Sequence, residues 1–71
     1  MLVMKEVEIN TEYIKLGQLL KHAGVCSSGT EAKFIILEGE VSLNGVVEKQ
    51  RGKKIVKGDM IETRGVSIKV V

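Results

Sequence analysis

The spacing of the apolar residues changes at Gly39, and this change limits the folds that the chain can adopt. Within residues 14–39 the apolar residues recur at intervals of three and four, as along one side of a helix. After Gly39 they alternate with polar residues, as in strands with one buried face. The sequence therefore predicts a single α+β domain over residues 1–71, in which two short helices pack on a small bent antiparallel sheet.

The first helix is predicted within residues 14–23. Gly24 stands where a left-handed C-terminal cap would end it. The side chains expected to face the core are those at helical intervals: Leu16, Leu19, Leu20 and Ala23.

The second helix is predicted to begin at Ser28 and to end at Gly39. Glu31 follows Ser28 by three residues, so each side chain can accept a hydrogen bond from a backbone N–H at the helix start. The expected buried stripe is Ala32, Ile35 and Ile36.

Strands and turns are predicted for the rest of the chain. Asn44-Gly45 suits a tight hairpin because both residues tolerate positive φ. Three further apolar runs are separated by residues 57–59 and by residues 64–65, and residues 3–9 alternate as an edge strand might.

Length and cysteine content restrict the class of protein. Seventy-one residues suffice for one domain with one thin core. Cys26 is the single cysteine, so no internal disulfide can form, and the expected location is the reducing cytoplasm. No stretch approaches the roughly 18 apolar residues of a membrane span, so we expect a soluble chain with no membrane partner.

Positive charge is concentrated in one segment. Residues 1–48 carry four Lys and seven Glu (net −3), whereas residues 49–71 carry seven Lys or Arg and two acidic residues (net +5). Five of these cations fall within residues 49–57, with no acidic residue among them. Such a block can be an ordinary solvated surface, but a concentrated positive field also attracts polyanions, of which nucleic acid is the commonest in the cytosol.

The residues from 14 to 63 resemble the S-four RNA-binding domain, a family named for small-subunit ribosomal protein four. Its pattern is a leucine-bearing helix, a Ser-(Arg)-x-x-Ala-x-x-x-Ile-x-x-Gly helix, then Val-x-Val-Asn-Gly, then Gly-Asp before a closing strand. The short length and the sequence RGKK at residues 51–54 look most like the stand-alone bacterial members of the YaaA type. The matching positions are Leu16, Leu19, Leu20, Ser28, Ala32, Ile36, Gly39, Val41, Leu43, Asn44, Gly45, Gly58 and Asp59.

The sequence departs from the family pattern in both helices. The Arg that often follows the serine is Gly29 here, and the second helix keeps only Lys33 of two basic residues. The familiar Asp of the first helix is Gly17, which lowers helix propensity by about 0.8–1 kcal/mol relative to alanine. The RNA-facing charge is therefore expected to lie more in the loop at residues 49–57 than on the second helix.

The resemblance implies structured RNA as the partner, with a ribosomal or tRNA-like stem as the expected target. We expect a monomer to bind it without a cofactor or a small-molecule substrate. Cations spaced to match backbone phosphates could recognise such an RNA. Ser28 could equally be a plain N-cap, although a cap and a phosphate contact can coexist. The predicted RNA-binding residues are Lys15, Lys21, Ser28, Gly29, Thr30, Lys33, Asn44, Arg51, Lys53, Lys54 and Lys57.

The aromatic content favours recognition of a stem or a stem–loop junction. Tyr13 and Phe34 are the only aromatic residues apart from the single histidine, too few for a platform that stacks single-stranded bases. Phe34 is expected in the core or at a helix edge. For about five neutralised phosphates, the logarithm of the association constant should fall with the logarithm of salt with a slope of roughly −3.5 to −4.5.

Catalysis and metal binding are not expected. His22 and Cys26 are four residues apart, but Gly24 should break the helix between them and no third orienting residue stands out. One His and one Cys are also fewer than the three or four protein ligands of a zinc site.

A protein-interaction adaptor remains the alternative to an RNA-binding module. A ubiquitin-like carrier would need a free diglycine tail, whereas this chain ends in SIKVV. In an adaptor, the apolar sequence FIIL at residues 34–37 and the terminal KVV could pair with another protein.

Overall fold

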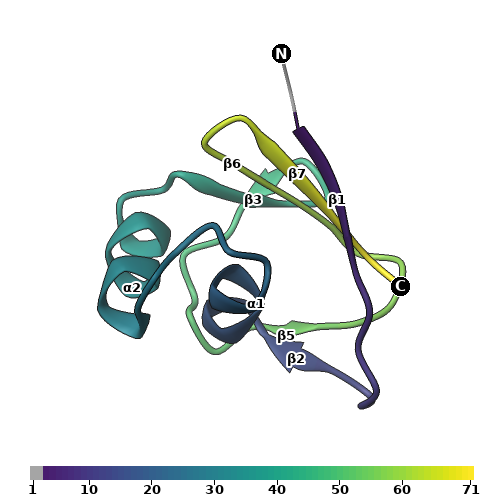
Figure 1. Ribbon diagram of the computed structural model, residues 1–71. Helices are drawn as coiled ribbons and strands as arrows, with labels where there is room; N and C mark the ends of the chain where they lie inside the picture. Colours follow the sequence, from purple (N-terminus) through teal and green to yellow (C-terminus); the bar gives the residue numbers. More distant parts are fainter. Residues whose placement is uncertain (1–2) are drawn as a thin grey trace.

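The computed structural model describes residues 3–71 as two helices, a five-stranded sheet and a separate two-stranded ribbon (Figure 1). This arrangement confirms the predicted α+β class. In chain order the elements are β1 (Val3–Val7), β2 (Ile14–Lys15), α1 (Leu16–His22), α2 (Gly29–Leu37), β3 (Val41–Leu43), β4 (Val46–Val47), β5 (Lys54–Ile55), β6 (Met60–Thr63) and β7 (Val66–Val70).

Both predicted helices form, with the expected signals at their ends. Gly24 and Gly39 adopt φ of 79° just after α1 and α2, the left-handed conformation that glycine allows at low cost. Ser28 is the N-cap of α2, and its Oγ accepts a hydrogen bond from the N–H of Glu31 at 3.2 Å. The Glu31 carboxylate accepts one from the N–H of Ser27, one residue earlier than in the usual capping box.

The five-stranded sheet has the order β1-β7-β6-β3-β4. Strands β3 and β4 form the predicted hairpin, in which Asn44 and Gly45 have φ of 51° and 87°. Positive φ at both central residues is typical of a type I′ turn, whose twist matches that of the strands. Strands β6 and β7 are joined in the same way through Arg64 and Gly65, with φ of 49° and 77°.

The pairing of β1 differs from the expected antiparallel sheet. β1 lies parallel to β7, with Val3 opposite Val66 and Val7 opposite Val70, so the sheet is mixed. The other pairs in this sheet are antiparallel. A parallel pair requires a long crossover connection, and here almost the whole domain forms that connection.

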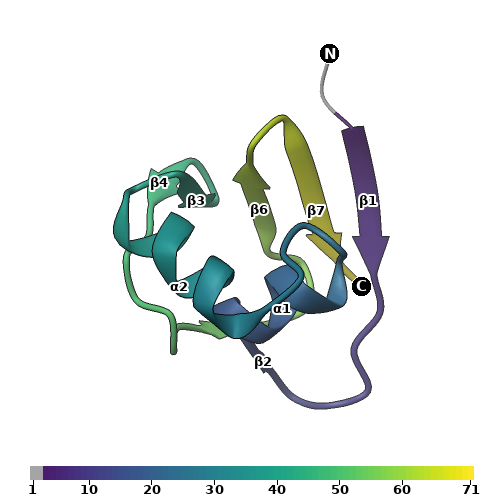
Figure 2. The same cartoon turned by 60° about the vertical axis from the view of Figure 1, so that its left-hand side comes forward.

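The two helices lie on one face of the five-stranded sheet, and the core fills the space between these layers (Figures 1 and 2). All predicted core positions of both helices are buried. The large side chains that have no exposed surface are Leu16, Leu19, Leu20, Ile35, Ile36, Val41, Ile55, Ile61, Ile68 and Val70. Neither helix within residues 3–71 has the length and apolar character needed to cross a bilayer.

Candidate nucleic-acid interface

The basic loop between β4 and β5 is docked onto the beginning of α1. The N–H of Leu16 donates to the carbonyl of Lys53 at 2.9 Å, and the N–H of Gly17 donates to the carbonyl of Arg51 at 3.1 Å. These are two of the N–H groups that have no partner within a helix. Antiparallel pairing of Lys15 with Lys54 continues the attachment through the β2–β5 ribbon. The loop is therefore held in place by main-chain bonds to the first helical turn.

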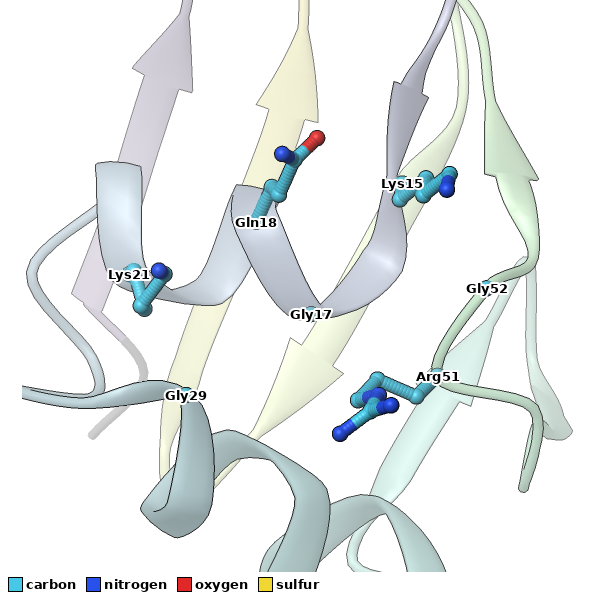
Figure 3. A pocket seen from close by; sticks show the side chains of 7 residues that line it. All are labelled: Lys15, Gly17, Gln18, Lys21, Gly29, Arg51 and Gly52. Carbon is cyan, nitrogen blue, oxygen red and sulfur yellow. The ribbon is translucent and has the colours of Figure 1, made fainter.

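Gly17 lets the side chain of Arg51 lie against this turn. A Cβ atom at position 17 would come within 2.8 Å of Arg51 Cγ and 3.4 Å of its Cδ. The first distance is shorter than real carbon contacts allow, so only glycine accommodates this arrangement without a shift. The guanidinium group then reaches from the loop toward the space between α1 and α2 (Figure 3).

A pocket of about 310 Å³ lies where this loop, α1 and the start of α2 meet. Three of its side chains are cationic and none is acidic, and they come from three different segments (Figure 3). The lining residues are Lys15, Gly17, Gln18, Lys21, Gly29, Arg51 and Gly52. Four of the predicted RNA-binding residues, Lys15, Lys21, Gly29 and Arg51, are thus brought together.

No carboxylate neutralises the cations of this pocket. Within residues 3–71 the single ion pair joins Arg64 to Glu40, with 3.3 Å between Nε and Oε1, and neither residue lines the pocket. Lys15, Lys21 and Arg51 are all exposed. Their combined field is therefore available to an anion from solution.

The predicted residues of α2 take different places. Gly29, its first residue, lines the pocket, and an added Cβ there would meet no protein atom within 4 Å. The Ser28 hydroxyl is engaged as the N-cap. Thr30 and Lys33 are exposed on α2 outside the pocket lining.

Lys53 and Lys54 are exposed at the docked loop, with Lys54 Nζ 4.8 Å from the centre of the Tyr13 ring.

Asn44 and Lys57 lie apart from the pocket. Lys57 is exposed in the turn after β5, next to Gly58, whose N–H donates to the carbonyl of Val70 at 2.8 Å. This turn is thus bonded to the end of β7, whereas the Arg51 carbonyl accepts from the N–H of Gly17 in α1. The Asn44 amide is hydrogen-bonded to Asp59 and to the backbone of Met60 within the same region. The structure thus gives Asn44 a place in turn formation, and RNA contact by these two residues stays a prediction.

Comparison with known proteins agrees with this geometry. The family described as "S4 domain" matches residues 7–71, which is most of the chain. The chain belongs to the S4 domain family.

Three comparisons with individual proteins cover most of this S4 domain. "Probable ribosome maturation protein RlbA" of Bacillus subtilis (strain 168) is 44% identical over 59 residues, which are 83% of each chain. YbcJ of Escherichia coli (strain K12) is 41% identical over 59 residues, 83% of this chain and 84% of YbcJ. The solution structure of Escherichia coli YbcJ matches with a TM-score of 0.70 at 34% identity, covering 99% of this chain and 87% of that one. That structure of YbcJ is described as revealing an αL motif involved in RNA binding.

Three residues of the pocket were not predicted from the sequence of this S4 domain. Gly17 and Gly52 have no side chain and Gln18 is uncharged, so a prediction based on positive charge does not identify them. Gly17 was interpreted only as a loss of helix propensity, whereas its contact with Arg51 depends on how the distant loop docks. A polar Gln18 midway between Lys15 and Lys21, at three-residue intervals along the predicted helix, was the single available signal.

Cys26 and His22 of this S4 domain differ in exposure to solvent. Cys26 is 4% exposed, while His22 is exposed at the end of α1. Burial, together with the nearby Glu31 carboxylate, raises the pKa of the Cys26 thiol, so the thiol stays protonated at neutral pH. Among residues 3–71, no three His, Cys, Asp or Glu side chains are grouped so as to hold a metal ion.

The expectation that Phe34 lies in the core or at a helix edge is met only in its second part. Phe34 is 58% exposed and Leu37 is 56% exposed, on the outer side of α2. The intervening Ile35 and Ile36 are fully buried, as the helical spacing requires.

Proposed function

We propose that this chain is an RNA-binding module that recognises structured RNA through backbone phosphates, and that the pocket between α1, α2 and the docked loop is the centre of its interface. The observation that carries the proposal is the convergence of Lys15, Lys21 and Arg51 on one pocket with no acidic lining residue. Membership of the S4 domain family and the RNA-binding motif described for YbcJ support the same partner.

The chemistry of the pocket suits phosphate. Arg presents a planar fork of donors that matches phosphate oxygens, and Lys adds compact charges beside it. Gly29 at the start of α2 would let a phosphate approach the first N–H groups of the helix closely. The docked loop fixes the backbone of Arg51, so less conformational entropy is lost when its side chain binds.

Ribosomal RNA is the proposed partner within this class. The support is the similarity to the Bacillus subtilis protein whose name refers to ribosome maturation. We include binding rather than catalysis in this proposal, and the RNA-binding motif described for YbcJ and the burial of Cys26 support it. We include in this proposal action as a monomer in the cytoplasm, without a cofactor or a small-molecule substrate.

The adaptor alternative is less well supported. It would use the terminal KVV as a free strand, but β7 is already paired on both sides, with β1 and β6. The exposed side chains of Phe34 and Leu37, within the FIIL sequence, still support the adaptor alternative.

Charge reversal at Arg51 tests the proposed interface. Arg51→Glu should weaken binding to an RNA hairpin by at least about tenfold, because a hydrogen bond between charged groups contributes about 1.5–3 kcal/mol. It should also make the slope of log association constant against log salt shallower, by about 0.7–0.9 for each lost phosphate contact. Titration at several salt concentrations, by fluorescence anisotropy of a labelled hairpin, measures both quantities.

Lys69→Glu is the matched control. It makes the same change in net charge on β7, at an exposed position outside the pocket lining. Affinity should change far less than in Arg51→Glu. If the two variants weaken binding equally, only net charge matters and the pocket is not the interface.

A further inference from the structure

A second concave surface adjoins the cationic pocket. It has a volume of about 560 Å³ and is lined by Thr11, Glu12, Tyr13, Ile14, Lys15 and Gln18. Lys15 and Gln18 line both pockets, so the two are continuous along one side of α1 and β2. A ligand bound in the first pocket therefore borders directly on the second.

The second pocket contains an aromatic ring. Tyr13 is 39% exposed, although its neighbour Ile14 packs against the core. Both sides of the Tyr13 backbone are held: the Thr11 hydroxyl donates to its carbonyl at 2.7 Å, and β2 begins at the next residue and pairs with β5. The ring is thus presented from a fixed position rather than from a free loop.

Lys54 adds a cation at the same ring. Its Nζ lies over the ring, 4.8 Å from the centroid, and so occupies one of the two ring faces. The other face is left for a nucleotide base, and Lys15, which lines both pockets, would lie between that base and a phosphate in the cationic pocket. Gln18 stands where the two pockets join and offers both hydrogen-bond donors and an acceptor for a base edge or a 2′-hydroxyl.

From this placement we propose that the second pocket receives a single unpaired base of the bound RNA, stacked on Tyr13, while the adjoining phosphate is held in the cationic pocket. The inference rests on the proposed function, since it assumes that RNA occupies the first pocket. It specifies the ligand further: a stem with an unpaired nucleotide beside it, rather than a continuous duplex. One exposed ring is sufficient for one such base, whereas a single-stranded platform needs several.

Two hairpin RNAs with the same number of phosphates test the inference. One has a fully paired stem, and the other has one unpaired nucleotide next to the stem. The unchanged protein should prefer the second hairpin about 5- to 10-fold, the lower end of the range for base–aromatic stacking. Tyr13→Phe should keep this preference because it keeps the ring, and Tyr13→Leu should reduce the ratio of the two dissociation constants to about one.

Intrinsic fluorescence gives a direct second readout. Tyr13 is the only tyrosine and the chain has no tryptophan, so the emission reports on this ring alone. The hairpin with the unpaired nucleotide should quench the tyrosine emission more than the fully paired hairpin does. Because the two RNAs absorb light similarly, the fully paired hairpin serves as the control for absorption by RNA.

The outcomes separate the inference from the proposed function. If the protein binds both hairpins equally through Arg51, or if Tyr13→Leu keeps the preference, the stacking site is refuted while phosphate recognition stands. If the protein binds neither hairpin, both proposals fail.

Discussion

The Arg51 side chain packs directly against Gly17, where a Cβ atom on residue 17 would come within 2.8 Å of Arg51 Cγ. Glycine at this position lowers helix propensity but lets the guanidinium group reach the pocket from a loop more than 30 residues away in the sequence. The glycine is thus better explained by the space that it leaves for the Arg51 side chain than by its effect on helix stability.

Replacing Gly17 tests this interpretation. Gly17→Ala should displace Arg51 and weaken RNA binding several-fold. The free energy of unfolding should change by less than about 1 kcal/mol, because the gain in helix propensity offsets the strained contact. Hairpin titration and urea denaturation measure the two effects.

A double-mutant cycle supplies the control for this prediction. If Gly17→Ala acts through Arg51, it should have little further effect on binding in an Arg51→Ala background. Additive losses would mean that Gly17 contributes to the interface independently of Arg51.

At the scale of elements, the β3–β4 hairpin is tied to the turn between β5 and β6. Asn44 Nδ2 donates to Asp59 Oδ1 at 3.1 Å, and Asn44 Oδ1 accepts from the N–H of Met60 at 2.9 Å. Asp59 Oδ2 in turn accepts from the N–H of Val56 at 2.9 Å. One asparagine therefore supplies both the left-handed turn conformation and a link between two connections.

Two substitutions of Asn44 separate these contributions. Asn44→Gly keeps the positive φ and should cost about 1–2 kcal/mol through the lost side-chain hydrogen bonds. Asn44→Ala should cost about 1 kcal/mol more, because an alanine in the left-handed region is strained. If the two variants have equal free energies of unfolding in urea, the left-handed backbone conformation is not the reason for asparagine at position 44.

The elements that local sequence determines were predicted well. Ser28, Gly24, Gly39 and the Asn44-Gly45 pair mark their boundaries through short-range chemistry, and the structure places each as expected. The β2–β5 ribbon and the parallel β1–β7 pair were missed. Both depend on contacts between distant segments, and alternation within a strand does not indicate its partner or the direction of pairing.

At the scale of the whole molecule, cations from three segments converge on one side of the helical layer. The sequence identified Lys15, Lys21 and Arg51 as candidates because charge is visible in it. The sequence could not distinguish these cations from Lys57. Arg51 and Lys57 are only six residues apart, but they lie before and after β5 and therefore at opposite ends of that strand. Docking of that loop on α1 decides which cations share the pocket.

The partner of the whole molecule can be identified in cells. Crosslinking followed by sequencing of the attached RNA should recover ribosomal RNA, concentrated at a stem with a neighbouring unpaired nucleotide. The Arg51→Glu variant serves as the control and should lose this signal. Recovery of many unrelated transcripts would contradict a dedicated ribosomal role and indicate a general RNA binder.

The parallel pairing of β1 with β7 has a consequence for how the chain is made. β1 leaves the ribosome before the other strands of this domain, but Val3 cannot pair until Val66 has been synthesised. At about 5–20 residues per second, this delay lasts roughly 3 to 13 seconds. The helices and the β3–β4 hairpin use nearby contacts and can form during that interval. β1, although it precedes the other strands of the sheet in the sequence, is therefore among the last to join that sheet.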